Sequence, residues 1–387
     1  MGKLHDRLFC IVFLVLICLP LIFFHYEEDR VSYVENKMSS KWPELSDYSL
    51  LSSDFTGAVE EYINDRVGFR DEMILLNISG MYTIFHDFDV TNFIEGKEKN
   101  TYYMDSGIIK CYQGTDLIDD GQMSEIVSSF EEIKNMLDDR SIEFIFFPIP
   151  NKEKIYPEYM PDDINVMSEN SMLFSVMRQM RGMDEFKVVD VYTALENSKE
   201  KNGLLYYRNY DSSHWNMNGA LVGCIELLDT ISDGNKDMFR YSERNDWIVS
   251  KEEIHNAIFY LQRFEIMKKT FSDMADYMYQ VMPQNGYVYV NDEQEEYYHA
   301  YNDELPDVKT VLIVGDSYIH AFMLPLLAEN FKEVYFFPVQ STDEEIASVL
   351  SKENIDYFVY EVVERMTNYG ELLSKEDKLK KIIKKSR

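Results

Sequence analysis

Cysteine, histidine and positive charge are all scarce in this sequence. Its 387 residues include 4 cysteines and 7 histidines, and 38 lysines and arginines stand against 69 aspartates and glutamates, for a net charge of −31. Their spacing shows neither a disulfide framework nor a cysteine–histidine metal site. The acidic balance argues against nucleic acid or an anionic surface as the main partner, because like charges repel. We expect a protein that uses no metal and no cofactor.

One long apolar run, Leu8–Phe24, lies near the amino terminus. It is at the lower limit for spanning a bilayer, and Lys3 and Arg7 precede it while acidic residues follow it. This asymmetry predicts a transmembrane signal anchor over residues 1–26, with a cytosolic amino terminus and an extracytoplasmic catalytic part. No small-residue cleavage site follows, which favours an uncleaved anchor over a removed signal peptide. The other alternative is a buried core helix.

The stretch from Val308 to Phe331 predicts a strand, a tight turn and a helix. Thr310–Val314 is apolar and suits a buried strand, Gly315-Asp316-Ser317 suits the turn, and the helical period runs from Tyr318 to about Asn330. Enzymes with α/β folds present nucleophiles beyond the carboxyl end of such a strand. Ser317 is therefore a candidate nucleophile, and the alternative is an ordinary helix N-cap.

A second stretch, about a hundred residues earlier, supplies the partners that a serine nucleophile needs. A neutral hydroxyl requires a base near pH 7, and a histidine works best when a carboxylate fixes its tautomer. Asp211 and His214 lie three residues apart at the start of a predicted helix. Taken alone, the pair could equally be an N-cap and a surface histidine. Together the two stretches favour Ser317, His214 and Asp211 as a catalytic triad.

These residues resemble the SGNH hydrolase superfamily, and the continuation after the histidine resembles its alginate O-acetyltransferase branch, the AlgX/AlgJ-like and DHHW-type proteins. The branch places its aspartate two residues before the histidine, where this chain has Ser212, whereas Asp211 has the three-residue spacing of other SGNH enzymes. The order aspartate, histidine, serine matches the permuted order of the branch. The motifs that carry the resemblance are Gly315-Asp316-Ser317, His214-Trp215-Asn216 with Gly219-Ala220, Asp65-Arg66 with Phe69-Arg70-Asp71, Pro148-Ile149-Pro150-Asn151-Lys152, Ile155-Tyr156-Pro157 and Glu364-Arg365.

The resemblance also points to residues that would bind substrate or an oxyanion. Asn151 and Lys152 follow a predicted strand on the same rim, and Arg365 could bind substrate or form a structural ion pair. Trp215 could be a sugar-stacking platform or a buried aromatic that braces His214. Tyr318, next to the serine, completes this group. His320 is a rival base, but no carboxylate partner for it is evident in the sequence.

Helices and strands alternate through the core, which predicts a mostly parallel sheet in a three-layer α/β/α domain of SGNH type. Ser250-Lys251-Glu252-Glu253 has the pattern of a capping box, so we expect an inserted helical segment, either a lid or a peripheral helix. The expected parts are residues 1–26, the anchor; 27–115, a stalk and an N-terminal helical segment packing on the core; 116–374, the catalytic domain with the insertion at about 232–306; and 375–387, a basic tail.

The predicted core elements are helices 124–137, 171–180 and 217–231 and strands 144–147, 187–191, 310–314, 334–337 and 357–362. Helix 56–82 precedes them, strand 287–290 lies in the insertion, and 292–307 is expected to be an acidic loop.

The function that this combination implies is transfer of acetyl groups to hydroxyls of an extracytoplasmic polysaccharide through an acyl-Ser317 intermediate. The resemblance implies a membrane-bound acyltransferase as the acetyl donor. A carbohydrate acetylesterase of the same fold and a non-catalytic polysaccharide-binding protein are the alternatives. The sequence does not name the polysaccharide, the donor or the oligomeric state.

Overall fold

The computed structural model describes residues 2–26, 30–32, 34, 37–44, 52–85, 93–255, 275–292, 297–305 and 308–386. The chain divides into two compact units. The first comprises Met1–Ile94 and His255–Met274, and the second comprises Glu95–Ile254 and Ala275–Arg387. Each unit is described by itself.

In the first unit, two consecutive helices are separated by a sharp break. The predicted single helix from Thr56 to Tyr82 is in fact α2, Ser53–Arg66, and α3, Arg70–Phe85. The break falls at Phe69, whose φ of 63° lies in the left-handed region that an α-helix does not use. The local apolar pattern continues across this position, so the sequence alone did not reveal the interruption.

Charged residues just before the break hold a short hairpin, β1 Val31–Ser32 paired with β2 Lys37–Met38. Asp65 accepts a hydrogen bond from the Ser40 amide at 2.8 Å, and its carboxylate lies 2.7 Å from Lys37 Nζ. Arg66 donates to the Ser40 carbonyl at 2.6 Å. This part of the family-like motif therefore has a structural use within the first unit.

The amino-terminal residues form α1, Gly2–Ile22. Of the helices in the described parts of the chain, none is both long enough and apolar enough to cross a membrane. The anchor expected over residues 1–26 is thus not confirmed and stays a prediction.

The second unit is built on a seven-stranded sheet in the order β6-β5-β13-β11-β12-β10-β9. The first five strands are parallel to one another, whereas β10 pairs antiparallel with both β12 and β9. Every residue of β11 and β13 is buried, as expected for strands covered on both faces. The predicted α/β fold with a mostly parallel sheet is confirmed. The strands are β5 Glu143–Ile149, β6 Lys187–Val188, β9 Val290–Asn291, β10 Tyr298–Tyr301, β11 Thr310–Gly315, β12 Glu333–Pro338 and β13 Tyr357–Val363.

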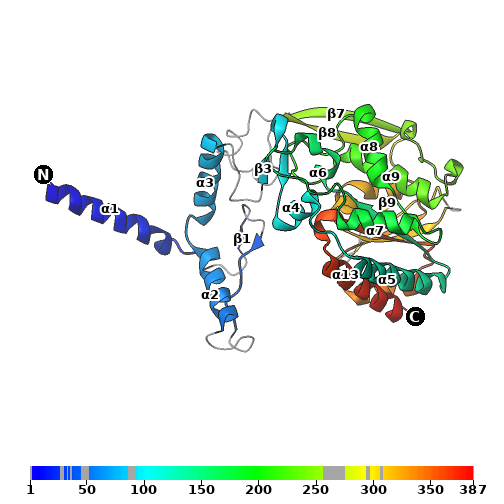
Figure 1. Ribbon diagram of the computed structural model, residues 1–387, viewed down its shortest axis with the longest axis horizontal. Coiled ribbons are helices and arrows are strands. Elements are labelled where there is room, and N and C mark those ends of the chain that lie inside the picture. The colour runs from blue at the N-terminus through cyan, green and yellow to red at the C-terminus, as the bar shows by residue number, and fades with distance from the viewer. Residues whose placement is uncertain are drawn as a thin grey trace. The chain divides into compact units, whose positions relative to one another are not determined.

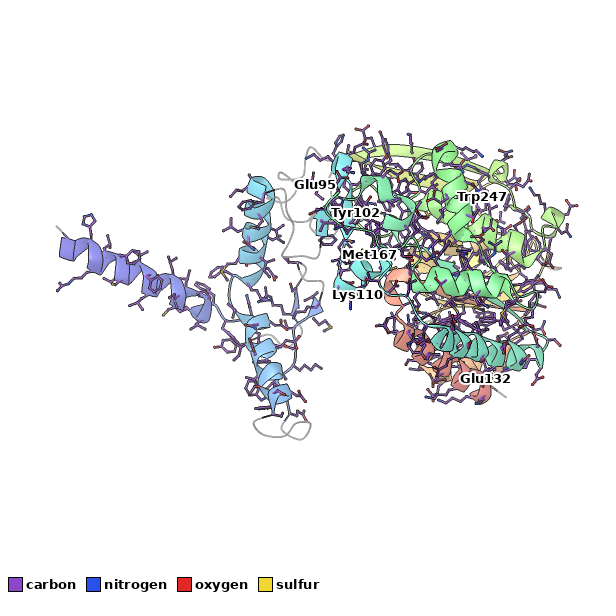
Figure 2. The ribbon with its side chains drawn as sticks, viewed as in Figure 1. Glu95, Tyr102, Lys110, Glu132, Met167 and Trp247 are labelled. Carbon is purple, nitrogen blue, oxygen red and sulfur yellow. The ribbon has the colours of Figure 1, made fainter. Side chains whose placement is uncertain are left out.

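Helices cover both faces of this sheet. On one side α5 and α13 lie against each other together with α12, and on the other side α8 packs on α9 (Figure 1). Side chains fill the space between these layers (Figure 2), and the aromatic rings of Phe130, Phe146 and Tyr360 meet in the core. The helices are α4 Ser106–Gln113, α5 Asp120–Asp138, α6 Lys152–Ile155, α7 Met172–Arg181, α8 Val191–Asn202, α9 Met217–Ile231, α11 Leu324–Ala328, α12 Asp343–Lys352 and α13 Tyr369–Lys385. The short strands β3 Phe93–Glu95 and β4 Thr101–Tyr103 precede them.

The inserted segment differs from its prediction. Where a helix was expected from Ser250, the structure has strand β7, Trp247–His255, paired with β8, Ala275–Pro283. The capping-box pattern is purely local, whereas β7 is specified by a partner strand that lies well beyond it in sequence. The expected helical positions Ile258, Leu261 and Phe271 lie outside the described residues.

The structure also differs from the predictions for residues 292–307 and 375–387. The acidic stretch 292–307, expected to be a loop, contributes β10 to the main sheet through pairing with β12. The basic stretch 375–387 belongs largely to α13, which buries Leu379, Ile382 and Ile383. Lys378 Nζ also donates to the carbonyls of Val339 and Ser341 at 2.9 and 2.6 Å, so this stretch packs on the second unit and is not a separate tail.

Candidate active site

Three neighbouring parallel strands end at the same edge of the sheet. The register pairs Ile149 of β5 with Val363 of β13, and β11 runs parallel beside β13. The segments that follow these strands begin with Pro150-Asn151, Glu364-Arg365 and Asp316-Ser317. The carboxyl ends of parallel strands are the usual place for a binding site in an open α/β sheet.

The turn that carries Ser317 is held by a buried glutamate of the neighbouring strand. Asp316 N–H donates to Glu361 Oε2 at 2.6 Å, and Tyr318 N–H donates to Asp316 Oδ1 at 2.8 Å. A Cβ on Gly315 would lie 2.6 Å from Glu361 Oε2, so the close approach requires glycine. Burial first, and then the charge of Asp316, raise the pKa of Glu361 well above its usual value.

The helix after the turn is irregular rather than the single α-helix expected to run to about Asn330. A π-helix, Ile319–Met323, precedes α11. Pro325 explains the irregularity, because it has no N–H to donate to the carbonyl of Ala321 four residues earlier. Wide turns of this kind occur frequently at functional sites. Ser317 remains exposed at the start of this segment.

The loop with His214 is anchored by the first turn of α9. Asn216 is the N-cap, and its side chain accepts hydrogen bonds from the amides of Asn218 and Gly219 at 2.9 and 3.1 Å. A Cβ on Gly219 would come within 2.1 Å of the Leu205 carbonyl oxygen. The Asn-x-x-Gly part of the motif is thus explained by helix capping and close backbone packing.

The structure brings Ser317, His214 and Asp211 into one hydrogen-bonded relay. His214 Nε2 lies 2.8 Å from Ser317 Oγ, and His214 Nδ1 lies 2.9 Å from Asp211 Oδ2. Asp211 Oδ1 also accepts from the amides of Ser213 and His214 at 2.9 and 3.0 Å. Burial raises the pKa of Asp211, but the charge and hydrogen bonds of His214 outweigh it and hold this pKa well below its usual value. This geometry suits a serine nucleophile with a histidine base.

The two alternatives to these partners lie elsewhere. Ser212, at the aspartate position of the alginate branch, is buried and lies 2.8 Å from Thr101 Oγ1 rather than beside the imidazole. The exposed His320 ring stacks on Phe336, with 5.5 Å between ring centroids. The imidazole within hydrogen-bonding distance of Ser317 is that of His214.

Arg365 and Tyr318 lie against the imidazole. Arg365 Nη2 is 3.3 Å from His214 Nε2, and Arg365 Nη1 donates to Tyr318 Oη at 3.1 Å. Burial lowers the pKa of Arg365, but Tyr318, Asp316 and Asp211 together raise it by more. The pKa therefore lies above its usual value, and Arg365 keeps its positive charge. A guanidinium here can donate to a negative oxygen that forms beside Ser317.

Trp215 and Asn151 support these groups from behind. Trp215 is fully buried and donates from Nε1 to the Tyr318 carbonyl at 3.0 Å, which favours the bracing interpretation over a sugar platform. Asn151 is buried; its Oδ1 accepts from the Arg365 amide at 3.0 Å, and its own amide donates to Glu364 at 3.1 Å. Asn151 therefore positions Arg365 rather than facing solvent.

Lys152 is also buried and holds two loops together. Its Nζ donates to the carbonyls of Thr101 and Arg208 at 2.7 and 2.8 Å. Burial lowers the pKa of Lys152 to about 7, although the charges of Asp276 and Asp211 oppose this effect. We assign Lys152 to the support of the loop before Asp211.

Sequence reasoning missed Asp276, a buried carboxylate on β8. Its Oδ2 accepts from the amides of Asn209 and Tyr210, each at 2.8 Å, immediately before Asp211. No local pattern marks this residue, because it reaches the loop from a hairpin more than sixty residues later in the chain. Over the residues with described positions, no group of three or more histidine, cysteine, aspartate or glutamate side chains is arranged to hold a metal ion.

The chain was compared with curated proteins and with solved structures. No curated protein matches the sequence. Among solved structures, Bacillus cereus PatB1 is similar with a TM-score of 0.52 at 13% identity, covering 70% of this chain and 96% of that one. Pseudomonas putida AlgJ, in its O-acetyltransferase domain, gives 0.44 at 15% identity, with coverage of 71% and 93%. A DHHW family protein from Eubacterium siraeum gives 0.46 at 14% identity, with coverage of 72% and 93%.

The family comparison is the more specific one. The model described as "SGNH hydrolase-like domain, acetyltransferase AlgX" matches residues 112–321, which is more than half of the chain. This range includes Asp211, His214 and Ser317, the three members of the relay. The chain therefore belongs to the AlgX family of SGNH hydrolase-like domains.

Proposed function

We propose that this protein transfers acetyl groups to hydroxyls of an extracytoplasmic polysaccharide through an acyl-Ser317 intermediate. The observation that carries the proposal is the relay in which His214 Nε2 lies 2.8 Å from Ser317 Oγ and His214 Nδ1 lies 2.9 Å from Asp211. Membership of a family that is described as an acetyltransferase supports acetyl as the transferred group.

In the first step, His214 Nε2 takes the proton of Ser317 as Oγ attacks the acetyl carbonyl carbon of the donor. The C–O bond to the donor's alcohol then breaks, and His214 returns the proton to that leaving oxygen. Asp211 holds the imidazole in the tautomer that accepts at Nε2 and stabilises the imidazolium between the two proton transfers. Arg365 donates to the oxygen that becomes negative in the tetrahedral intermediate.

In the second step, a sugar hydroxyl replaces the donor alcohol. His214 takes its proton, the sugar oxygen bonds to the acetyl carbon, and the proton returns to Ser317 Oγ as the acyl bond breaks. Because Ser317 is exposed, water can compete for the acyl group. Transfer then depends on how well the acceptor is held, since positioning can be worth an effective molarity on the order of 10⁵ M or more.

The proposal also specifies where the protein acts and which two partners it needs, an acetyl donor and a polysaccharide acceptor. A signal anchor over residues 1–26 would hold the second unit outside the membrane, where a membrane-bound acyltransferase would supply the acetyl group and a polysaccharide would receive it. The net charge of −31 supports a neutral acceptor over an anionic one.

The experiment is to treat the chain from residue 27 onward with an activated acetyl ester and find the modified residue by peptide mass spectrometry. We expect one acetyl group on Ser317 and none in Ser317→Ala. Adding neutral oligosaccharides should then give acetylated sugar at the expense of free acetate. Release of acetate alone, with removal of acetyl from acetylated glycans, would establish the esterase instead, and no acylation at all would leave a binding protein.

A further inference from the structure

We infer that the second unit contains a separate subsite that binds a stretch of neutral sugar chain, between α4, α6, α7 and α8. This inference rests on the proposed function, because it names a place where the acceptor polysaccharide would be held. A cavity of about 660 Å³ lies among these helices. Ligand-binding cavities usually measure about 300 to 1,000 Å³, so this one is large enough for a few sugar rings.

One wall of the cavity is aromatic. Phe174 of α7 is partly exposed and packs against Tyr192 of α8, with ring centroids 4.9 Å apart at an angle of 44°. The other apolar residues of the lining are Tyr112, Ile155, Pro157 and Val166. Apolar faces with a few convergent polar groups are typical of cavities that bind small organic ligands, and a sugar ring offers one apolar face and a polar edge.

The polar group best placed to meet such a ligand is Glu153 of α6. It lines the cavity, its side chain is 3% exposed, and its Oε1 has no hydrogen-bond partner in the described part of the chain. Burial raises the pKa of Glu153 to about 8, so the group is mainly a neutral acid at pH 7. A buried polar atom without a partner is unfavourable, because it has given up its hydrogen bonds to water. Protein atoms cover Oε1, so a sugar hydroxyl would supply the missing hydrogen bond, as donor or acceptor, once the side chain turns toward the cavity.

The charges around the cavity favour a neutral ligand. Lys154 and Arg178 are balanced by Glu169 and Glu196. These groups also have partners of their own: Lys154 Nζ donates to the Glu169 carbonyl at 3.4 Å, Arg178 lies 5.9 Å from the centre of the Phe174 ring, and Glu196 pairs with Lys199 at 3.2 Å. No excess of one sign remains to recognise an ion, and the acidic chain as a whole repels polyanions.

The subsite is joined to the catalytic relay through the end of β5. Glu153 follows Asn151 by two residues, and Asn151 accepts the hydrogen bond from the Arg365 amide at 3.0 Å. The same short segment therefore lines the cavity and positions the arginine beside His214. A polysaccharide chain held here would keep acceptor hydroxyls concentrated near the enzyme.

The test is calorimetric titration of the wild-type protein with maltotriose, cellotriose and chitotriose, and with trigalacturonate as the anionic comparison. We expect at least one neutral trisaccharide to bind and trigalacturonate to bind more weakly. Phe174→Ala should weaken that binding about tenfold or more by removing the aromatic wall. Val166→Trp should weaken it without any loss of packing, because Val166 is 46% exposed at the rim of the cavity.

The matched control is Phe322→Ala, which removes an aromatic ring 5.9 Å from that of His214. It should leave trisaccharide affinity within about twofold if the ligand sits in the cavity. Binding that Phe322→Ala abolishes and Phe174→Ala preserves, or no binding of any trisaccharide, would overturn the inference.

Measuring acetyl-ester turnover of the same variants distinguishes failure of the subsite from failure of the proposed function. Turnover of a small ester needs the relay of Ser317, His214 and Asp211, none of which lines the cavity, so Phe174→Ala and Val166→Trp should turn the ester over like wild type. If trisaccharide binding depends on Phe174 but the protein turns over no acetyl ester, the proposed function is refuted and the binding subsite is supported.

Discussion

Replacing Asp211 by asparagine tests whether the relay needs the His214 tautomer that carries its proton on Nδ1. In the wild-type protein Asp211 Oδ1 accepts from the amides of Ser213 and His214, while Oδ2 faces His214 Nδ1 at 2.9 Å. Asparagine can keep its oxygen toward the two amides and place its NH₂ group toward Nδ1. Nδ1 must then accept, and the ring proton moves to Nε2, which faces Ser317 Oγ at 2.8 Å. No lone pair remains at Nε2 to take the proton of the serine.

The magnitude follows from this geometry. Loss of the correct tautomer in a serine–histidine–aspartate relay lowers kcat by about 10⁴. That factor corresponds to about 5.5 kcal/mol of transition-state stabilisation. Because the two amide hydrogen bonds remain, the free energy of unfolding should change by no more than about 1 kcal/mol. Activity and stability are thus expected to separate by several kcal/mol.

The assay is steady-state hydrolysis of an activated acetyl ester, with urea titration of the same samples for stability. Ser212→Ala is the matched control, because Ser212 is adjacent in sequence but contacts Thr101 at 2.8 Å instead of the imidazole. It should keep kcat within a few-fold and lose only about 1 kcal/mol of stability. A loss in Asp211→Asn smaller than about tenfold, or an equal loss in Ser212→Ala, would refute the reasoning.

Five further substitutions test other parts of the site. Ser317→Ala should abolish acetyl-ester turnover with nearly unchanged Tm, and His214→Ala should lose far more activity than His320→Ala; wild-type turnover without the serine hydroxyl, or the reverse order of the histidines, would show that the relay is misassigned. Both carboxylate oxygens of Asp276 accept from amides, Oδ2 from Asn209 and Tyr210 and Oδ1 from Tyr277, so Asp276→Asn must turn its NH₂ group toward an N–H in either orientation. Urea titration should show a loss of about 2 kcal/mol, and an unchanged midpoint would contradict the role given to Asp276. The pKa of Lys152 is about 7 when folded and near 10.5 when unfolded, so the unfolded chain holds the extra proton between these values. Wild-type stability should therefore rise from about pH 7 to about pH 9.5 relative to Lys152→Met in urea titrations, and parallel pH profiles would exclude a lowered pKa.

Local patterns in the sequence were sufficient for the parts of the site that depend on neighbours in the chain. The apolar run before Gly315 predicted a buried strand, and β11 is that strand. The helix predicted from Met217 to Ile231 has those bounds in the structure, because its N-cap and apolar face lie within its own residues. The candidate nucleophile, base and carboxylate could be chosen from the sequence because few residue types can fill each of these roles near pH 7.

Contacts between distant segments were decided by the tertiary structure alone. His214 and Ser317 are 103 residues apart in the sequence but within hydrogen-bonding distance in the structure. Spacing from His214 favoured Asp211, whereas the spacing of the alginate branch pointed to Ser212. The folded chain places Asp211 against the imidazole and Ser212 against Thr101. Asp276 had no local signal, and the capping-box pattern at Ser250 gave way to strand pairing. A hydrogen bond to a partner far along the chain leaves no periodicity in the sequence, so only the folded chain determines where a buried carboxylate points.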